Sequence, residues 1–117
     1  MDVRELVDAV IAGDLVTARQ WVADAYRARI RWEDLRCPTE LSDENAAVAA
    51  GLVELLATRA GVQPPSWTTS VGAIPNEIVL DPGLDQMPRS FAYARAAGPE
   101  PLRKRNLVAL PDFLDVA

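Results

Sequence analysis

The chain has 117 residues, of which half are hydrophobic and a quarter charged, and its net charge is −5. This composition is that of a globular protein with a single hydrophobic core and excludes a disordered chain. The sequence contains no histidine, which argues against zinc sites, Ser–His–Asp triads and Cys–His pairs. The acidic charge also disfavours nucleic acid, because phosphate binding needs a cationic surface.

The sequence gives no indication of a membrane protein. Its apolar runs are shorter than the roughly 20 residues that a spanning helix needs, and its first residues lack the basic and long apolar regions of a signal peptide. The single cysteine, Cys37, cannot form an intramolecular disulfide and fits a reducing compartment. We therefore expect a cytoplasmic protein without metal or cofactor, in which Cys37 is a small buried hydrophobic residue.

Helical periodicity of the apolar residues predicts three helices in the first 60 residues. They cover about residues 2–12, 14–30 and 43–60, with a short helical turn expected in the connection between the second and the third. Asp14 and Ser42 stand at the positions that N-capping side chains occupy. The first half of the chain is therefore predicted to be regular and helical.

The second half, residues 61–117, is punctuated by prolines and predicted to be irregular, with one or two short helices. Glu77–Leu80 is β-prone but has no evident partner strand. Residues 84–97 are predicted to form a helix that Pro88 starts or bends, and Pro111 is expected to open a final helical turn. The whole chain is thus expected to be a mainly α, compact single domain, with residues 1–60 as its helical half.

Aromatic side chains are expected to hold the irregular half against the core. The large apolar area of Trp67 is costly to expose, so we expect this residue to pin its loop. The alternative is an exposed anchor for a partner. Further along the chain, Phe91 is expected to point inward together with Tyr93 or Ala94.

Two basic segments are candidate partner-binding sites. In the first, Arg27, Arg31 and Arg36 surround Trp32, and arginine with tryptophan is the composition enriched at interface hot spots. The competing interpretation is that arginine stems cover the indole in an ordinary folded surface. The second is Arg103-Lys104-Arg105, the densest positive cluster, which could contact a phosphate or an acidic partner. Its alternative is a solvated loop.

Catalytic chemistry has little basis in the sequence. Glu33, Asp34 and Glu40 are close enough in sequence to pair as acid and base, but acids near helix ends are ordinarily caps and solubilising charges. A glycine-rich phosphate loop is missing from the sequence. We therefore expect no catalytic residues, with a small carboxylate-dependent enzyme as an alternative.

Four short motifs lie between Asn45 and the end of the chain: Leu55–Gly61, Pro65–Trp67, Leu80–Leu84, and Pro101–Asn106 followed by Leu107-Val108. With these motifs, Asn45 to Ala117 resembles a C-terminal module of bacterial, especially actinobacterial, helix-turn-helix regulators. Such regulators are often encoded beside nucleotidyltransferase-type toxins. The resemblance implies an antitoxin-like module that works by protein association, with a toxin from a neighbouring gene as its partner.

Two departures from that family limit what the resemblance implies. The DNA-reading helix-turn-helix is not evident in the first 44 residues, and Glu77–Leu80 replaces the aromatic residues that commonly precede the turn in the middle of the module. DNA binding is therefore not implied, and a DNA-binding regulator that uses Arg27–Arg36 stays an alternative. The acidic, tryptophan-containing chain is also compatible with a symmetric homodimer.

Overall fold

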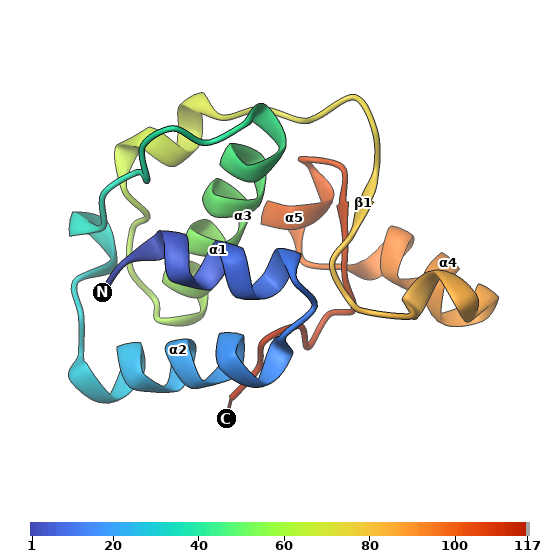
Figure 1. Cartoon of the computed structure of the whole chain (residues 1–117), viewed down its shortest axis with the longest axis horizontal. Coiled ribbons are helices and arrows are strands. Elements are labelled where there is room, and N and C mark those ends of the chain that lie inside the picture. Colours follow the sequence, from blue (N-terminus) through green and yellow to red (C-terminus); the bar gives the residue numbers. More distant parts are fainter. Residues whose placement is uncertain (117) are drawn as a thin grey trace.

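Three α-helices form the first half of the chain in the computed structural model, which describes residues 1–116. They are α1 (Val3–Ile11), α2 (Leu15–Ala28) and α3 (Asp43–Arg59), close to the predicted bounds. Helices α1 and α2 lie side by side in opposite directions, and α3 packs against α1 (Figure 1). A short 3-10 helix, η1 (Trp32–Asp34), lies in the connection between α2 and α3.

The predicted capping residues set the starts of these helices. A carboxylate oxygen of Asp14 accepts a hydrogen bond from the Thr17 N–H at 3.1 Å, and the Ser42 hydroxyl accepts one from the Asn45 N–H at 3.1 Å. Between α1 and α2, Gly13 has a φ of 74°, a left-handed conformation that favours glycine. A glycine followed by an N-capping aspartate therefore produces the tight turn that reverses the chain.

Only short elements occur in the second half. These elements are η2 (Ser66–Ser70), β1 (Ile78–Val79), η3 (Leu84–Gln86), α4 (Pro88–Ala97), α5 (Glu100–Arg103) and β2 (Leu107–Val108). Of these, η2 packs against α3, and α4 and α5 lie between the two strands in the sequence.

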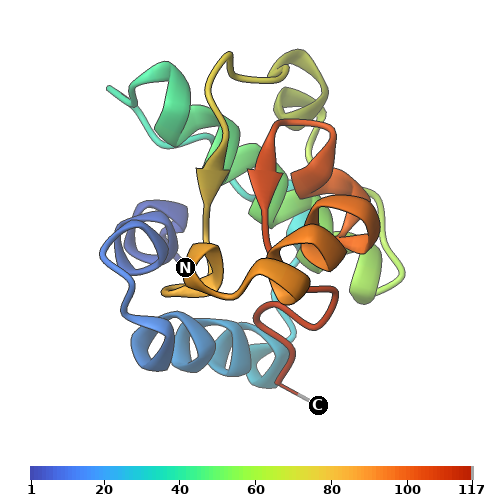
Figure 2. The ribbon, with the colours of Figure 1, turned by 90° about the vertical axis from the view of Figure 1, so that its right-hand side faces the viewer.

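Strand β1 has a partner, contrary to the sequence-based prediction. It pairs in parallel with β2, with Ile78 opposite Leu107 and Val79 opposite Val108, and the two strands lie side by side in Figure 2. The prediction was wrong because Leu107 and Val108, the two residues of β2, were not predicted to form a strand. A parallel pair also needs a long crossover, which η3, α4 and α5 provide here.

Three further details of the second half differ from prediction. The helix expected over residues 84–97 is divided into η3 and α4, and of the two roles left open for Pro88 the start of a helix is confirmed, since Pro88 stands in the first turn of α4. The short helix α5 was not expected, because it begins directly after Pro99 and includes Pro101. Pro111 begins a hydrogen-bonded turn rather than a helix.

Helix α4 lies at the edge of the molecule and extends away from the other helices (Figure 1). Ala94 is its only buried residue, while Phe91 is half-buried. The alternative left open between Tyr93 and Ala94 is thereby resolved, since the Tyr93 side chain is 56% exposed.

The main hydrophobic core draws side chains from both halves of the chain. Val7, Val22 and Leu56 of the first three helices are fully buried there, and Leu107 and Leu114 of the second half join them. The radius of gyration is 13.2 Å, against about 13 Å expected for a compact chain of this length. A mainly α, compact fold is thus confirmed. Within residues 1–116, no helix has the length and apolar character needed to cross a membrane.

The contact between α3 and α5 depends on a glycine. A Cβ atom added to Gly51 would lie 2.9 Å from the Leu102 side chain and 3.3 Å from the Pro101 carbonyl oxygen. Glycine at this point of α3 therefore allows α5 to approach the helix backbone. Leu102 is fully buried as a result, and the chain segment that follows it is held against the core.

Candidate interaction groove

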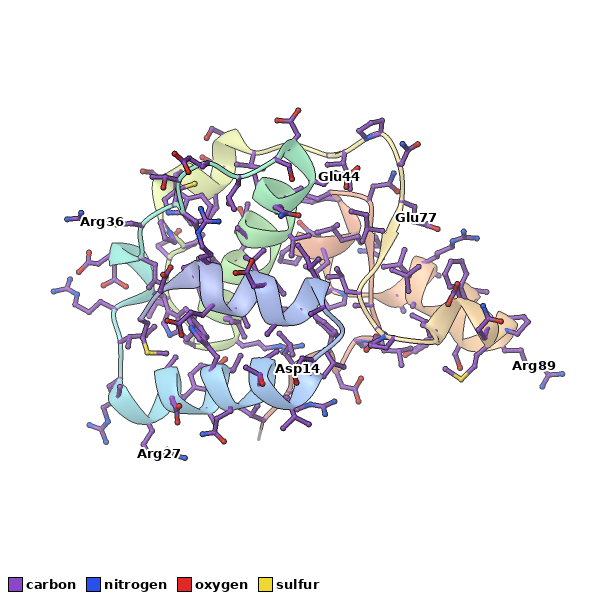
Figure 3. The ribbon with its side chains drawn as sticks, in the orientation of Figure 1. Asp14, Arg27, Arg36, Glu44, Glu77 and Arg89 are labelled. Carbon is purple, nitrogen blue, oxygen red and sulfur yellow. The ribbon has the colours of Figure 1, made fainter. Side chains whose placement is uncertain are left out.

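A groove lies between the start of α1 and the connection from α2 to α3. Its cavity volume is about 620 Å³, and its lining includes three arginines, Arg4, Arg31 and Arg36, together with Asp34 and Cys37. Arg36 stands at the outer edge of the molecule in Figure 3, with its side chain directed away from the ribbon. Two of the predicted site residues, Arg31 and Arg36, are thus brought together, and Arg4 joins them from a different element.

Trp32, the first residue of η1, is buried next to Arg31 in the sequence and does not line the groove. Its side chain is only 3% exposed, and its ring packs against the rings of Trp21 and Tyr26 with centroid separations of 6.2 and 5.6 Å. Tilted aromatic pairs at such separations add to the stability that burial gives. The expectation that Trp32 itself contacts a partner needs correction: Trp32 anchors η1 and leaves the surface to the arginines around it.

Two other tryptophans fix the walls of the groove. Trp21 Nε1 donates a hydrogen bond to the Asp2 carbonyl oxygen at 3.0 Å, which holds the start of α1. Trp67 Nε1 donates to the Leu35 carbonyl oxygen at 2.8 Å, and Trp67 packs partly buried against the main core. Trp67 therefore pins its loop as predicted, and both walls are positioned by side chains on distant elements.

Only some of the arginine side chains in the groove are paired with other groups of the chain. Arg31 Nε lies 3.1 Å from a Glu33 carboxylate oxygen and 3.2 Å from one of Asp34, and the Arg4 guanidinium donates to the Thr39 carbonyl oxygen. Arg36, by contrast, makes neither an ion pair nor a side-chain hydrogen bond with any residue that the structure describes. Its guanidinium is the group in this groove that is open to an outside acceptor.

Cys37 is exposed at the groove, contrary to the prediction of a small buried residue. Its thiol lies 3.4 Å from the Pro38 carbonyl oxygen. The prediction fails because the extended connection is held to the protein by Trp32 and half-buried Leu35, which leaves Cys37 outside the core.

Arg27 lies outside this groove, although the sequence placed it in the same candidate segment. Its guanidinium is 3.1 Å from an Asp24 carboxylate oxygen on the same face of α2, and it lines a different depression with Tyr26 and Arg59. Figure 3 shows Arg27 and Arg36 on different sides of the molecule's left end.

The second candidate segment, Arg103-Lys104-Arg105, does not form one surface. The Arg103 guanidinium donates to the Ala96 carbonyl oxygen at 2.6 Å, at the end of α4. Lys104 is about half exposed, and its Nζ lies 2.9 Å from a Glu54 carboxylate oxygen. These two residues reach different neighbours, and neither lines the groove.

Arg105 is buried, with 2% of its surface exposed, so it cannot contribute to a contact surface. Its guanidinium donates to the Glu54 carboxylate at 2.7 Å and to the carbonyl oxygens of Thr68 and Pro101, each at 2.8 Å. A third carbonyl, that of Val71, accepts from Arg105 Nε at 3.1 Å. The prediction for Arg105 is therefore corrected: this residue joins α3, η2 and α5 from within.

Glu54 is the buried acid that makes this arrangement possible. Burial by itself raises its pKa, but the hydrogen bonds from Arg105 and Lys104 outweigh burial and lower the pKa to about 2. The carboxylate is therefore ionised at neutral pH and balances the buried guanidinium. Sequence analysis did not single out Glu54 or Arg4, since each acts through a residue distant in sequence.

Neither the described residues nor the comparisons with known proteins point to a known activity. Within residues 1–116, no three His, Cys, Asp or Glu side chains are grouped so that they could hold a metal ion. Comparisons with known protein families, with curated proteins and with solved structures give no match. The resemblance of residues 45–117 to an antitoxin-like module thus stays a prediction, and its last residue, Ala117, lies outside the described residues.

Proposed function

We propose that this chain is a non-enzymatic protein-interaction module that binds an acidic segment of a protein partner in the groove between α1 and η1. The observation that carries the proposal is the exposure of Arg36 beside Arg4 and Arg31. The Arg36 guanidinium has no acidic partner within the described chain. A planar guanidinium recognises a carboxylate through two parallel hydrogen bonds, which gives both attraction and orientation.

The groove is well suited to this role because its backbone is already held in place. Trp21 and Trp67 tie its two walls, and the buried Trp32 ring packs against Trp21 and anchors η1. A partner that binds here does not have to order the loop first, so less of the binding free energy is lost as conformational entropy.

The resemblance of the second half indicates which partner to test. In keeping with it, we propose that the chain acts in the cytoplasm as the antitoxin, or an accessory partner, of a toxin-like enzyme encoded by a neighbouring gene. In this proposal the groove faces the partner, and the three helices of the first half serve as its scaffold.

The local charges favour this proposal over the two alternatives. A nucleic acid would need several free cations, but Arg27 and Arg31 are already paired with acids, in a chain of net charge −5. A carboxylate enzyme built on Glu33, one of the candidate acids of the sequence, would need that acid to have a raised pKa. The backbone N–H of Glu33, and then Arg31, lower the pKa of the Glu33 carboxyl instead.

The test is binding of the purified chain to the product of the adjacent gene, measured by calorimetry and by inhibition of any toxicity in cells. Replacing Arg36→Glu is expected to weaken the complex at least about tenfold, which corresponds to about 1.4 kcal/mol. Arg27→Glu is the control, because Arg27 is also exposed but lies outside the groove. Absence of a complex, or equal affinities of the two variants, would overturn the proposal.

A further inference from the structure

A second cavity lies between α2, the end of α3 and residues 111–116, the C-terminal segment, which runs past α2 in Figures 1 and 2. Its volume is about 620 Å³, within the range of about 300–1,000 Å³ that small-molecule sites have. The apolar part of its lining consists of Ala23, Leu114 and Val116. Among the described residues, none lines both this cavity and the groove, so what binds here does not depend on the groove's function.

Existing contacts hold the walls of this cavity in place. On α2, the ring of the lining residue Tyr26 packs against the buried Trp32 ring at a centroid separation of 5.6 Å. On α3, one guanidinium nitrogen of Arg59 donates to the Phe113 carbonyl oxygen at 2.6 Å, and the other donates to that of Pro111 at 3.1 Å. The C-terminal segment is thereby fixed against α3. A ligand would enter a largely preformed site, as is usual for small-molecule sites.

Arg59 holds the C-terminal segment without having its charge neutralised. Both groups to which it donates are uncharged carbonyl oxygens, and a guanidinium carries five N–H donors in all. Arg59 is exposed and makes no ion pair with any residue that the structure describes. Its remaining N–H groups are therefore available to a carboxylate, the group that a planar guanidinium binds most strongly together with phosphate.

The same cavity is also lined by a negative charge, that of Asp115 on the C-terminal segment. A carboxylate has about four acceptor sites, so Asp115 can receive a cationic group in addition to the contact it already makes. Tyr26 lies close to both charges: burial raises the pKa of its hydroxyl, while Arg59 lowers it and Asp115 raises it. This hydroxyl is therefore a neutral donor at physiological pH. The cavity combines a positive group, a negative group and an apolar surface.

We propose that this cavity binds a small zwitterion with an apolar part, which is the chemistry of a free α-amino acid such as phenylalanine. The carboxylate of the ligand pairs with Arg59, its ammonium group pairs with Asp115, and its apolar part lies against Ala23 and Val116. Because Arg59 and Asp115 carry opposite charges, a ligand with both charges fits better than an anion or a cation of the same size. For a ligand of this size we expect a dissociation constant of about 1–10 mM.

Titration of the isotope-labelled full chain at neutral pH, followed by NMR of its backbone amides, tests the proposal. L-Phenylalanine should shift the amide signals of α2 and of the C-terminal segment. Two analogues each lack one charge: 3-phenylpropionate has no ammonium group and 2-phenylethylamine has no carboxylate. Each should bind at least about tenfold more weakly, because it loses a hydrogen bond between charged groups. The amine thus tests the contact with Arg59 without removing a side chain that holds the C-terminal segment.

Asp115→Asn should weaken the binding of L-phenylalanine about tenfold and leave that of 3-phenylpropionate unchanged. Asp112→Asn is the matched control, because Asp112 is exposed on the same segment but does not line the cavity, and it should bind both ligands like the wild type. The proposal is overturned if L-phenylalanine shifts no signal of the wild type up to about 20 mM, or if either analogue binds it as tightly. Equal binding of L-phenylalanine to the two variants also overturns it. The comparison of the three ligands on the wild type does not require that either variant fold.

Discussion

Replacing Glu54→Gln is expected to destabilise the fold by about 3 kcal/mol, the lower end of the range for breaking a buried ion pair. The variant leaves the Arg105 guanidinium charged in a site where only 2% of the residue is exposed. The carbonyl oxygens around Arg105 still accept hydrogen bonds, but none of them neutralises its charge. Lys104 remains half exposed and regains water, so its loss of a partner adds little.

The pKa of Glu54 gives an independent magnitude. The carboxyl group has a pKa of about 2 in the folded protein and an ordinary value of 4.5. This difference corresponds to about 3 kcal/mol of stability at neutral pH. Because the folded value is the lower one, the stabilisation is present above the ordinary pKa and is lost as the pH falls toward 2. Between pH 5 and pH 3, about 2 kcal/mol should disappear.

Urea unfolding followed by tryptophan fluorescence measures both effects, since Trp21 and Trp32 are buried in the fold. The wild type and the Glu54→Gln variant are compared at pH 7, 5 and 3. Glu44→Gln, an exposed change in the first turn of the same helix, serves as the control and should cost less than about 1 kcal/mol. The reasoning fails if Glu54→Gln lies within about 1 kcal/mol of the wild type at pH 7, or if both lose stability equally on acidification.

Two further predictions concern backbone packing and thiol exposure. Gly98→Ala should lower the free energy of unfolding by about 1–3 kcal/mol, because the added Cβ would lie 2.6 Å from the carbonyl oxygens of both Ala94 and Ala109. Gly72→Ala, where nothing lies within 4 Å, should change it little in the same urea titration. Cys37 should react stoichiometrically with a thiol reagent in native buffer, whereas protection until denaturant is added would contradict its exposure.

The helices of the first half could be predicted because their signals are local. Each consists of an apolar face at helical spacing, bounded by a capping side chain such as Asp14 or Ser42 and by a residue that ends the helix. These signals lie within the element that they specify. Tertiary packing then has few alternative helix bounds to choose from. The bounds predicted from the sequence therefore agree closely with those in the structure.

The second half could not be predicted to the same degree because its pairings join distant residues. Strands of two residues show no alternation, and the partner of Ile78 is Leu107, on the far side of two helices. Prolines were taken as interruptions of structure, although Pro101 stands in the first turn of α5, where its missing N–H is not needed. Only the three-dimensional neighbours distinguish these cases.

The same difference between local signals and contacts of distant residues explains why the candidate sites were predicted only in part. Arg103, Lys104 and Arg105 are consecutive, but a run of charges says nothing about which member is buried. The signal that sequence analysis could have used is Glu54, an acid within an otherwise apolar stretch of α3. An acid at such a position requires a buried cation, and Arg105, 51 residues later, supplies it.

The placement of the tryptophans determines how the proposed groove would bind a partner. Trp21, Trp32 and Trp67 are all used inside the protein, so the groove offers a partner guanidinium groups and no aromatic anchor. Affinity there would rest on charge and would fall as salt screens the partner's carboxylates. A series of binding measurements across salt concentrations would therefore test whether the groove binds its partner through these guanidinium groups.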